Sequence, residues 1–294
     1  MKTTPADFIN QVNTITENGG TTTTKFEALT KRWNTFANLE DDMQAELIKA
    51  VLDPKVKPEE LARLHALAIA AAGSNPVTEA TVRNSVAAEI LAALRIEYRT
   101  VAEANYETIR ERFNDLAEQL TDALEVVDSD ASPELMVKAD STTRTAWADA
   151  PAHAYQLTAL LPTLHTAALL AGTTQPSGHA DKLLIGLTTN TEGLHRRRVW
   201  EAWNNTTGRA LQWRELWKLG ATIEAPALND IKPYREPKPM ETRAERANYG
   251  VRQFAYDPED ETYEAERDQL QRTAIAAGIN QIDYTDNETG VHIN

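Results

Sequence analysis

The residues with the most distinctive chemistry are the arginines and tryptophans between Thr191 and Gly220. This stretch holds six Arg or Lys and three Glu, a net charge of +3, in a chain whose formal net charge is −14. Guanidinium groups beside indole rings bind phosphate, stack on bases or anchor protein interfaces. The candidate interface residues are Arg196, Arg197, Arg198, Trp200, Trp203, Trp213 and Trp217.

Three interpretations of this Arg/Trp stretch are open. In the simplest, two helices turn at 204–208, the tryptophans face each other and the arginines extend into solvent. In the second the stretch binds another protein, and in the third it binds a nucleic acid. A net charge of −14 opposes a polyanion, so the protein interface is the favoured functional interpretation. The acidic segment downstream is a candidate partner for the arginines, within one chain or between copies.

Motifs that would indicate catalysis are missing from the sequence. It has no phosphate-binding or dinucleotide-binding loop, no zinc-protease helix, no nucleophile elbow and no EF-hand loop. The six histidines never fall three or four residues apart, and there is no cysteine to act as a nucleophile or zinc ligand. Acidic clusters at 40–42, 128–130 and 283–288 lack the spacing of a calcium loop. We therefore predict no enzymatic activity, cofactor or metal. The alternative is an enzyme whose catalytic carboxylates are dispersed along the chain.

Length and charge bear on the partners and the compartment. With 294 residues, 41% of them hydrophobic, the chain is long enough to bury a core. Its acidic balance disfavours general binding to nucleic acid or to anionic membranes. The N-terminus lacks the apolar core of a signal peptide, and no run approaches the ~18 apolar residues of a membrane span. We expect protein partners, in a homo-oligomer or a larger assembly, and a location in the cytoplasm or in a virion.

The longest element is a helix predicted over about 77–128. This segment contains no Gly or Pro, and its apolar residues recur every three or four positions. At about 1.5 Å per residue such a helix extends roughly 78 Å, so it needs packing partners from the same chain or from other copies. The seam consists of Val82, Val86, Ile90, Leu94, Tyr98, Val101, Asn105, Ile109, Phe113, Leu116, Leu120, Leu124 and Val127.

The spacing of this seam argues against a leucine zipper. The mean step between successive seam residues is about 3.75 residues. This value is nearer to the roughly 3.67 residues per turn of an eleven-residue repeat than to the roughly 3.5 of a heptad. Asn105 is the one polar member. It either fixes the register between helices or lies where the seam meets water, and we take the second as the simpler interpretation.

The remaining pattern predicts an all-α, elongated protein with three regions, 1–130, 131–222 and 223–294. Prolines and glycines separate the helices, and Pro162 predicts a kink or break in an otherwise apolar helix. The four short N-terminal helices are expected to form a small bundle at the foot of the long helix. The predicted helices cover 5–15, 25–39, 41–52, 58–72, 133–148, 151–171, 180–187, 191–204, 208–219 and 257–278.

Residues 223–257 read as an extended, proline-bearing arm that packs poorly against its own domain. The region 223–294 has 15 acidic and 8 basic residues, which accounts for −7 of the −14. Such an arm reaches a neighbouring subunit or remains a solvated tail.

This helical, acidic, cysteine-free chain, rich in Ala and Thr, resembles structural proteins of bacteriophages, especially those of actinobacterial hosts. The resemblance implies a non-enzymatic assembly protein associated with a virion. The alternative is an accessory protein that contacts nucleic acid through the Arg/Trp stretch.

Overall fold

The chain is mostly helical, which confirms the predicted all-α class. The computed structural model describes residues 3–38, 43–52, 56–72, 76–247 and 250–260. The predicted helix over 257–278 and the acidic cluster at 283–288 therefore lie largely or wholly outside the described residues. The helices are α1 (Pro5–Glu17), α2 (Thr24–Ala37), α3 (Met43–Leu52), α4 (Pro58–Ala72), α5 (Pro76–Val126), α6 (Pro133–Lys138), α7 (Ser141–Ala171), α8 (Asp181–Thr188), α9 (Arg196–Asn204) and α10 (Leu211–Leu219), with a 3₁₀ turn η1 (Leu228–Asp230).

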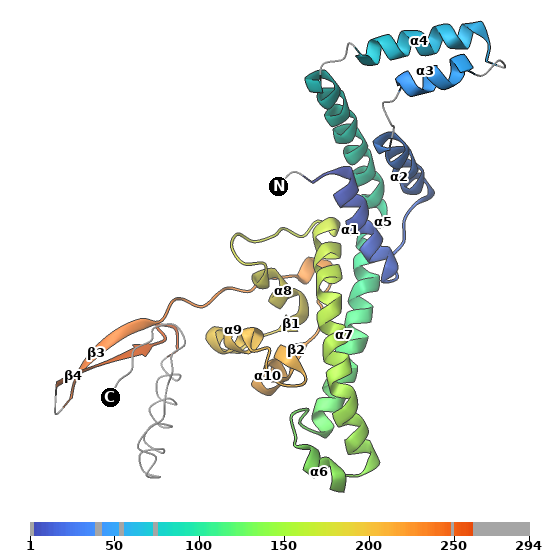
Figure 1. Ribbon diagram of the computed structural model, residues 1–294. Helices are drawn as coiled ribbons and strands as arrows, with labels where there is room; N and C mark the ends of the chain where they lie inside the picture. The colour runs from blue at the N-terminus through green and yellow to red at the C-terminus, as the bar shows by residue number, and fades with distance from the viewer. Residues whose placement is uncertain (1–2, 39–42, 53–55, 73–75, 248–249, 261–294) are drawn as a thin grey trace.

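The molecule is elongated around the long helix α5 (Figure 1). Helix α7 runs antiparallel beside the C-terminal half of α5, and α1 and α2 lie along its more N-terminal part. Helices α8, α9 and α10 cover one side of the α5–α7 pair. The α3–α4 hairpin stands at one far end, and a hairpin of β3 (Glu241–Ala247) and β4 (Gly250–Tyr256) projects from the opposite side.

Helix α5 finds its partners within its own chain over most of its length. The seam side chains from Leu94 to Leu124 are buried or half-buried, with Ile109, Phe113 and Leu120 at 0% exposure. One continuous cluster of buried side chains joins α1, α2, α5 and the elements from α7 to the arm, so the predicted regions 1–130 and 131–222 share one core. Before Leu94 the seam opens, and Val82 is 56% exposed.

Helix α7 is continuous, so the expected separation at 149–150 was wrong, and of the kink or break predicted at Pro162 the break was wrong. Both Pro151 and Pro162 lie inside Ser141–Ala171. Each interior proline costs about 3 kcal/mol. The helix nevertheless buries Leu157, Leu160 and Leu164, each worth roughly 1.5–3 kcal/mol, together with several alanines that let α7 approach α5 closely. Tertiary burial outweighs the local preference of proline.

The expected bundle of four short helices does not form. Helices α1 and α2 pack on α5, whereas α3 and α4 pack on each other at the end of the molecule. The side chains of Phe8, Phe26 and Tyr98 meet between α1, α2 and α5, with ring centroids 6.0 to 6.4 Å apart. This aromatic contact brings the first two helices to the middle of α5.

Asn105 does not lie where the seam meets water, so that simpler interpretation was wrong. It is 1% exposed, and its amide binds the backbone of the loop between α1 and α2. Its Oδ1 accepts from the Thr21 N–H at 2.7 Å, and its Nδ2 donates to the Thr21 carbonyl at 2.9 Å. Asn105 therefore fixes the position of the α1–α2 loop along α5.

The predicted arm is more structured than expected. Strands β3 and β4 form an antiparallel ladder from the Glu241–Tyr256 pair to the Ala247–Gly250 pair. The segment before it packs against its own body, because Asn114 of α5 bonds both the N–H and the carbonyl of Ala225. The expectation of poor packing was wrong for this part of the arm. A second small sheet pairs β1 (Thr189–Asn190) with β2 (Thr222–Ile223).

Replacing Asn105 with Ala should lower the free energy of unfolding by about 1–3 kcal/mol, because the Thr21 backbone groups would lose their buried partner. Urea unfolding followed by circular dichroism measures this change. Thr108→Ala is the control, since the exposed Thr108 hydroxyl bonds only the carbonyl of Ala104 on the same helix. Equal stability of the two variants would contradict the role assigned to Asn105.

Candidate interaction sites

Helices α9 and α10 form a hairpin that carries all seven predicted interface residues. Two tryptophans face each other inside it, as in the simplest interpretation of the sequence. Trp203 and Trp213 meet edge to face with ring centroids 5.9 Å apart. Trp213 is fully buried, contacts Phe113 of α5 and donates to the Thr158 hydroxyl at 2.9 Å. These two tryptophans belong to the core of the chain.

The other two tryptophans are half-buried at the edge of the same hairpin. Trp200 stacks on Tyr234 of the arm, with centroids 6.1 Å apart and an interplanar angle of 6°. Trp217 packs against the rim of the core. The arm thus covers one face of Trp200, and the exposed part of the Arg/Trp stretch is smaller than its sequence suggests.

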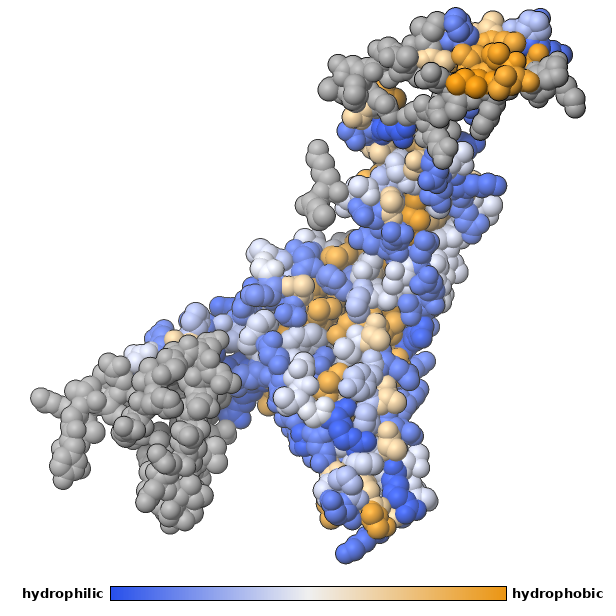
Figure 2. All heavy atoms as spheres, in the orientation of Figure 1, coloured by the Kyte–Doolittle hydropathy of each residue, from blue (hydrophilic) through white to orange (hydrophobic). Residues whose placement is uncertain are grey.

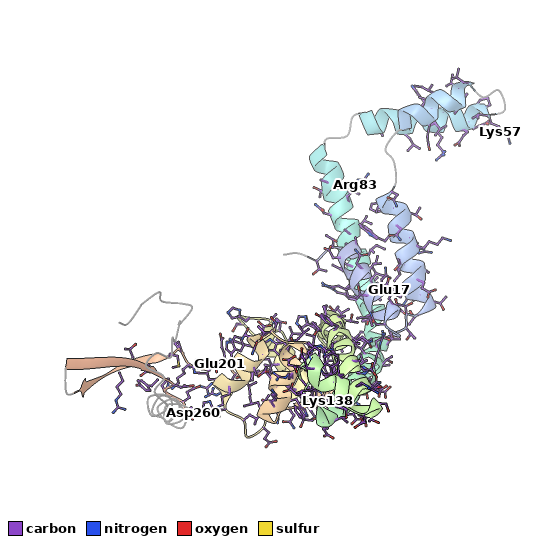
Figure 3. The ribbon with its side chains drawn as sticks, turned by 60° about the horizontal axis from the view of Figure 1, so that its bottom comes forward. Glu17, Lys57, Arg83, Lys138, Glu201 and Asp260 are labelled. Atoms are coloured by element: carbon purple, nitrogen blue, oxygen red, sulfur yellow. The ribbon has the colours of Figure 1, made fainter. Side chains whose placement is uncertain are left out.

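The basic row, His195–Arg198, faces carboxylates at the base of the arm. We call these carboxylates, Asp257, Glu259 and Asp260, the acidic latch. Figure 3 shows Asp260 where the projecting hairpin joins the body. The three predicted arginines are therefore engaged within the chain. The pairs are Arg197 with Asp257 (2.5 Å), Arg196 with Glu259 (2.7 Å), His195 with Asp260 (3.4 Å) and Arg198 with Asp260 (3.8 Å).

The pair of Arg197 and Asp257 is the most buried contact of the latch. The Asp257 side chain is 0% exposed and that of Arg197 is 11% exposed. Burial, the largest single influence, acts to raise the pKa of Asp257, but the hydrogen bonds from Arg197 and the Glu259 N–H, together with the charge of Arg197, outweigh it, and the pKa lies below its usual value. Arg197 also donates to the Lys238 carbonyl, so one guanidinium binds both ends of the hairpin.

Between the core and the acidic latch, the arm is held against α8 and α9 by backbone and side-chain contacts. The Tyr234 N–H donates to the Lys182 carbonyl of α8 at 2.7 Å, and the Tyr234 hydroxyl donates to the Arg196 carbonyl. A Cβ at Gly186 would lie 2.1 Å from the Lys232 carbonyl oxygen, so only glycine allows the arm to pass this closely over α8. The Lys182 ammonium lies 2.8 Å from the Glu236 carboxylate.

A second ionic cluster joins the end of α5 to α10. Arg214 lies 2.6 Å from Asp128, 3.3 Å from Asp130 and 2.5 Å from Glu215. The hydrogen bonds from Arg214 hold the pKa of Asp128 well below its usual value. This explains the acidic cluster at 128–130 as a structural ion-pair site.

The turn between α9 and α10 needs a glycine beside this cluster. Gly208 has a φ of 85°, and a Cβ there would lie 2.4 Å from Asp130 Oδ2. The Arg209 guanidinium covers the Trp147 ring at 3.5 Å. These contacts hold the α9–α10 hairpin against the loop that follows α5 and against α7.

The α3–α4 hairpin, which we call the tip, exposes apolar side chains that the sequence analysis did not single out. Figure 2 shows hydrophobic atoms gathered at this end of the molecule. Burying one such side chain stabilises a contact by roughly 1.5–3 kcal/mol, so together they form a surface suited to association. The exposed members are Ile48 (53%), Val51 (62%), Leu52 (77%) and Leu67 (39%).

The described residues show neither a metal-binding cluster nor a membrane-spanning helix. Among them, no three His, Asp or Glu side chains are arranged to hold a metal ion. A groove between α1 and α2 is lined mostly by Thr and Asn, with Glu27 and Lys31 as its ionisable groups. Over the same part of the chain, no helix combines the length and apolarity needed to span a bilayer.

Comparisons with protein-family models, with curated proteins and with solved structures give no match to this chain. The interpretation of the sites therefore depends on their geometry.

Replacing Asp257 with Asn should loosen the base of the hairpin, because Arg197 would keep its buried charge without a carboxylate. Breaking such a pair costs about 3 kcal/mol, so trypsin cleavage after Arg235, the basic residue of this segment that does not precede a proline, should accelerate by roughly tenfold or more. Asp230→Asn, an exposed change in the same arm, is the control and should cleave at the wild-type rate. Unchanged cleavage of the Asp257 variant would contradict the latch.

The ion pair of Asp128 should make stability depend on pH. Because the pKa of Asp128 is lower in the folded state, its contribution is complete above the unfolded value near 3.9 and disappears as pH falls through the folded value. Asp128→Asn should cost about 1 kcal/mol at pH 7, discounted for partial exposure, and progressively less as the pH falls below about 3.9. Thermal unfolding between pH 2 and 7 tests this, with Asp122→Asn on the exposed face of α5 as control. A pH-independent difference would contradict it.

Proposed function

We propose that this protein is a non-enzymatic assembly protein that joins other proteins through contacts at its ends. The observation that carries the proposal is the apolar surface of the tip, which stands apart from the common core. A monomer that worked alone would gain from burying Val51 and Leu52, whereas an assembly component needs them accessible.

The rest of the architecture supports this proposal. The tip and the β3–β4 hairpin project from opposite sides of a body held together by the α5–α7 core (Figure 1). The acidic latch holds the base of the hairpin against α9. A two-stranded ladder presents backbone groups along both outer edges and is only marginally stable alone, so its edges are suited to a further strand. A virion is the setting we propose for such a component, on its resemblance to bacteriophage structural proteins.

Two alternatives receive less support. A nucleic-acid contact through the Arg/Trp stretch would require phosphates to displace carboxylates from Arg196 and Arg197, against the net charge of −14. An enzyme with dispersed carboxylates would require a cleft that gathers them, and the groove between α1 and α2 contains Glu27 as its one carboxylate.

The proposal is tested by a photo-crosslinking amino acid at Leu52, introduced into the full chain in the cells that naturally make it. Illumination should yield covalent adducts with protein. The matched control is the same amino acid at Val137 of α6, since both side chains are 77% exposed. Adducts that depend on position 52 support the proposal. No protein adduct from the tip, or equal labelling from both positions, would contradict it.

A further inference from the structure

We infer that the tip is a self-association surface, and that its occupant is the tip of a second copy of this chain. This inference rests on the proposed assembly function and names the partner. The two α3–α4 hairpins would pack on each other around a two-fold axis as four helices, burying apolar residues that each copy alone leaves in water.

The tip cannot form a core by itself. Among its described residues, the buried apolar side chains are Ala50 (9%) and Leu64 (7%). Helix α3 has 10 residues and α4 has 15, lengths at which an isolated helix is marginal in water. On α3 the exposed Ile48, Val51 and Leu52 follow the i, i+3, i+4 spacing of one helix face. A second hairpin would give this face a partner.

Charge favours a copy of the same tip as that partner. Residues 43–72 contain four acidic and four basic residues, so the tip has no net formal charge in a chain that carries −14. A surface selected for a strongly charged partner would show the opposite sign. A neutral tip does not repel a copy of itself, so two tips of an otherwise acidic chain can meet across a two-fold axis.

The length of α5 keeps the acidic bodies apart in such a pair. The buried seam of α5 begins at Leu94, 18 residues after Pro76, a rise of about 27 Å. This exceeds the screening length of about 8 Å at physiological ionic strength. Two tips can therefore meet with little repulsion between the bodies. Figure 3 shows Lys57 at the outer end of the tip, far from the α9–α10 hairpin.

The purified full chain should show a light-scattering mass of twice 32.6 kDa at high concentration. Val51→Glu with Leu52→Glu should weaken this dimer roughly a hundredfold or more, because charges would enter its apolar centre. Leu135→Glu with Val137→Glu on α6 is a matched control, since its two sites have the same exposures, 62% and 77%. Circular dichroism should show equal helicity in both variants.

The absence of native cysteine permits a direct test of the contact. Each variant should be treated with a short bismaleimide at a concentration at which light scattering shows the dimer. Covalent dimers should form from at least one of the single changes Ile48→Cys, Val51→Cys, Leu52→Cys and Leu67→Cys. Val137→Cys should remain a single chain. A chain that stays monomeric at every concentration would overturn the inference. A dimer unaffected by the Glu changes at 51 and 52 would also overturn it.

The two proposals fail differently. If the purified chain is a monomer but position 52 crosslinks to another protein in cells, self-association is wrong and the assembly function stands. If position 52 gives no protein adduct in cells, the assembly function itself fails.

Discussion

The burial of the C-terminal half of α5 against α7 is the contact on which the other parts of the structure depend. Phe113 illustrates this, because it lies in the α5 seam and also meets Trp213 of α10. The same helix supplies Asn114, which holds the arm at Ala225, and the loop that follows it supplies Asp128, which Arg214 binds. The layer formed by α8, α9 and α10 is thus positioned by the helix pair beneath it.

Local signals in the sequence located most of the helices, but they did not show how the helices pack, and they misplaced the boundary between α6 and α7. The absence of Gly and Pro predicted α5 almost to its ends, and the apolar seam identified Ile109 and Phe113 as core. The seam omitted Tyr106, whose hydroxyl bonds the Pro226 carbonyl at 2.8 Å. The sequence also led us to place Asn105 in water, because a single polar residue in an apolar seam does not show that a loop distant in the sequence will bind it. Proline was overweighted in α7, where the stabilisation comes from burial that only the tertiary structure reveals.

For the candidate sites too, the sequence indicated which residues matter but not which residues they contact. Clustering of arginine and tryptophan drew attention to α9 and α10, and the charge pattern suggested acidic partners downstream. Which carboxylates pair with Arg197, and in the same chain, depends on the path of the arm over Gly186. The tip was missed because Val51 and Leu52 look like ordinary core residues of an amphipathic helix. Their exposure results from where α3 and α4 come to lie, and a single sequence contains no direct signal for that.

The continuity of α5 makes the orientation of the tip a matter of counting residues. An α-helix turns by about 100° and rises about 1.5 Å with each residue. Deleting one residue between Val82 and Leu94 would thus swing the α3–α4 hairpin a quarter turn or more around the rod, while shortening the rod only slightly. Changes of seven residues would nearly restore its original bearing. The number of residues between Pro76 and Leu94 therefore sets the direction in which the α3–α4 hairpin points. Insertions or deletions of two helical turns should preserve that direction far better than changes of a single residue.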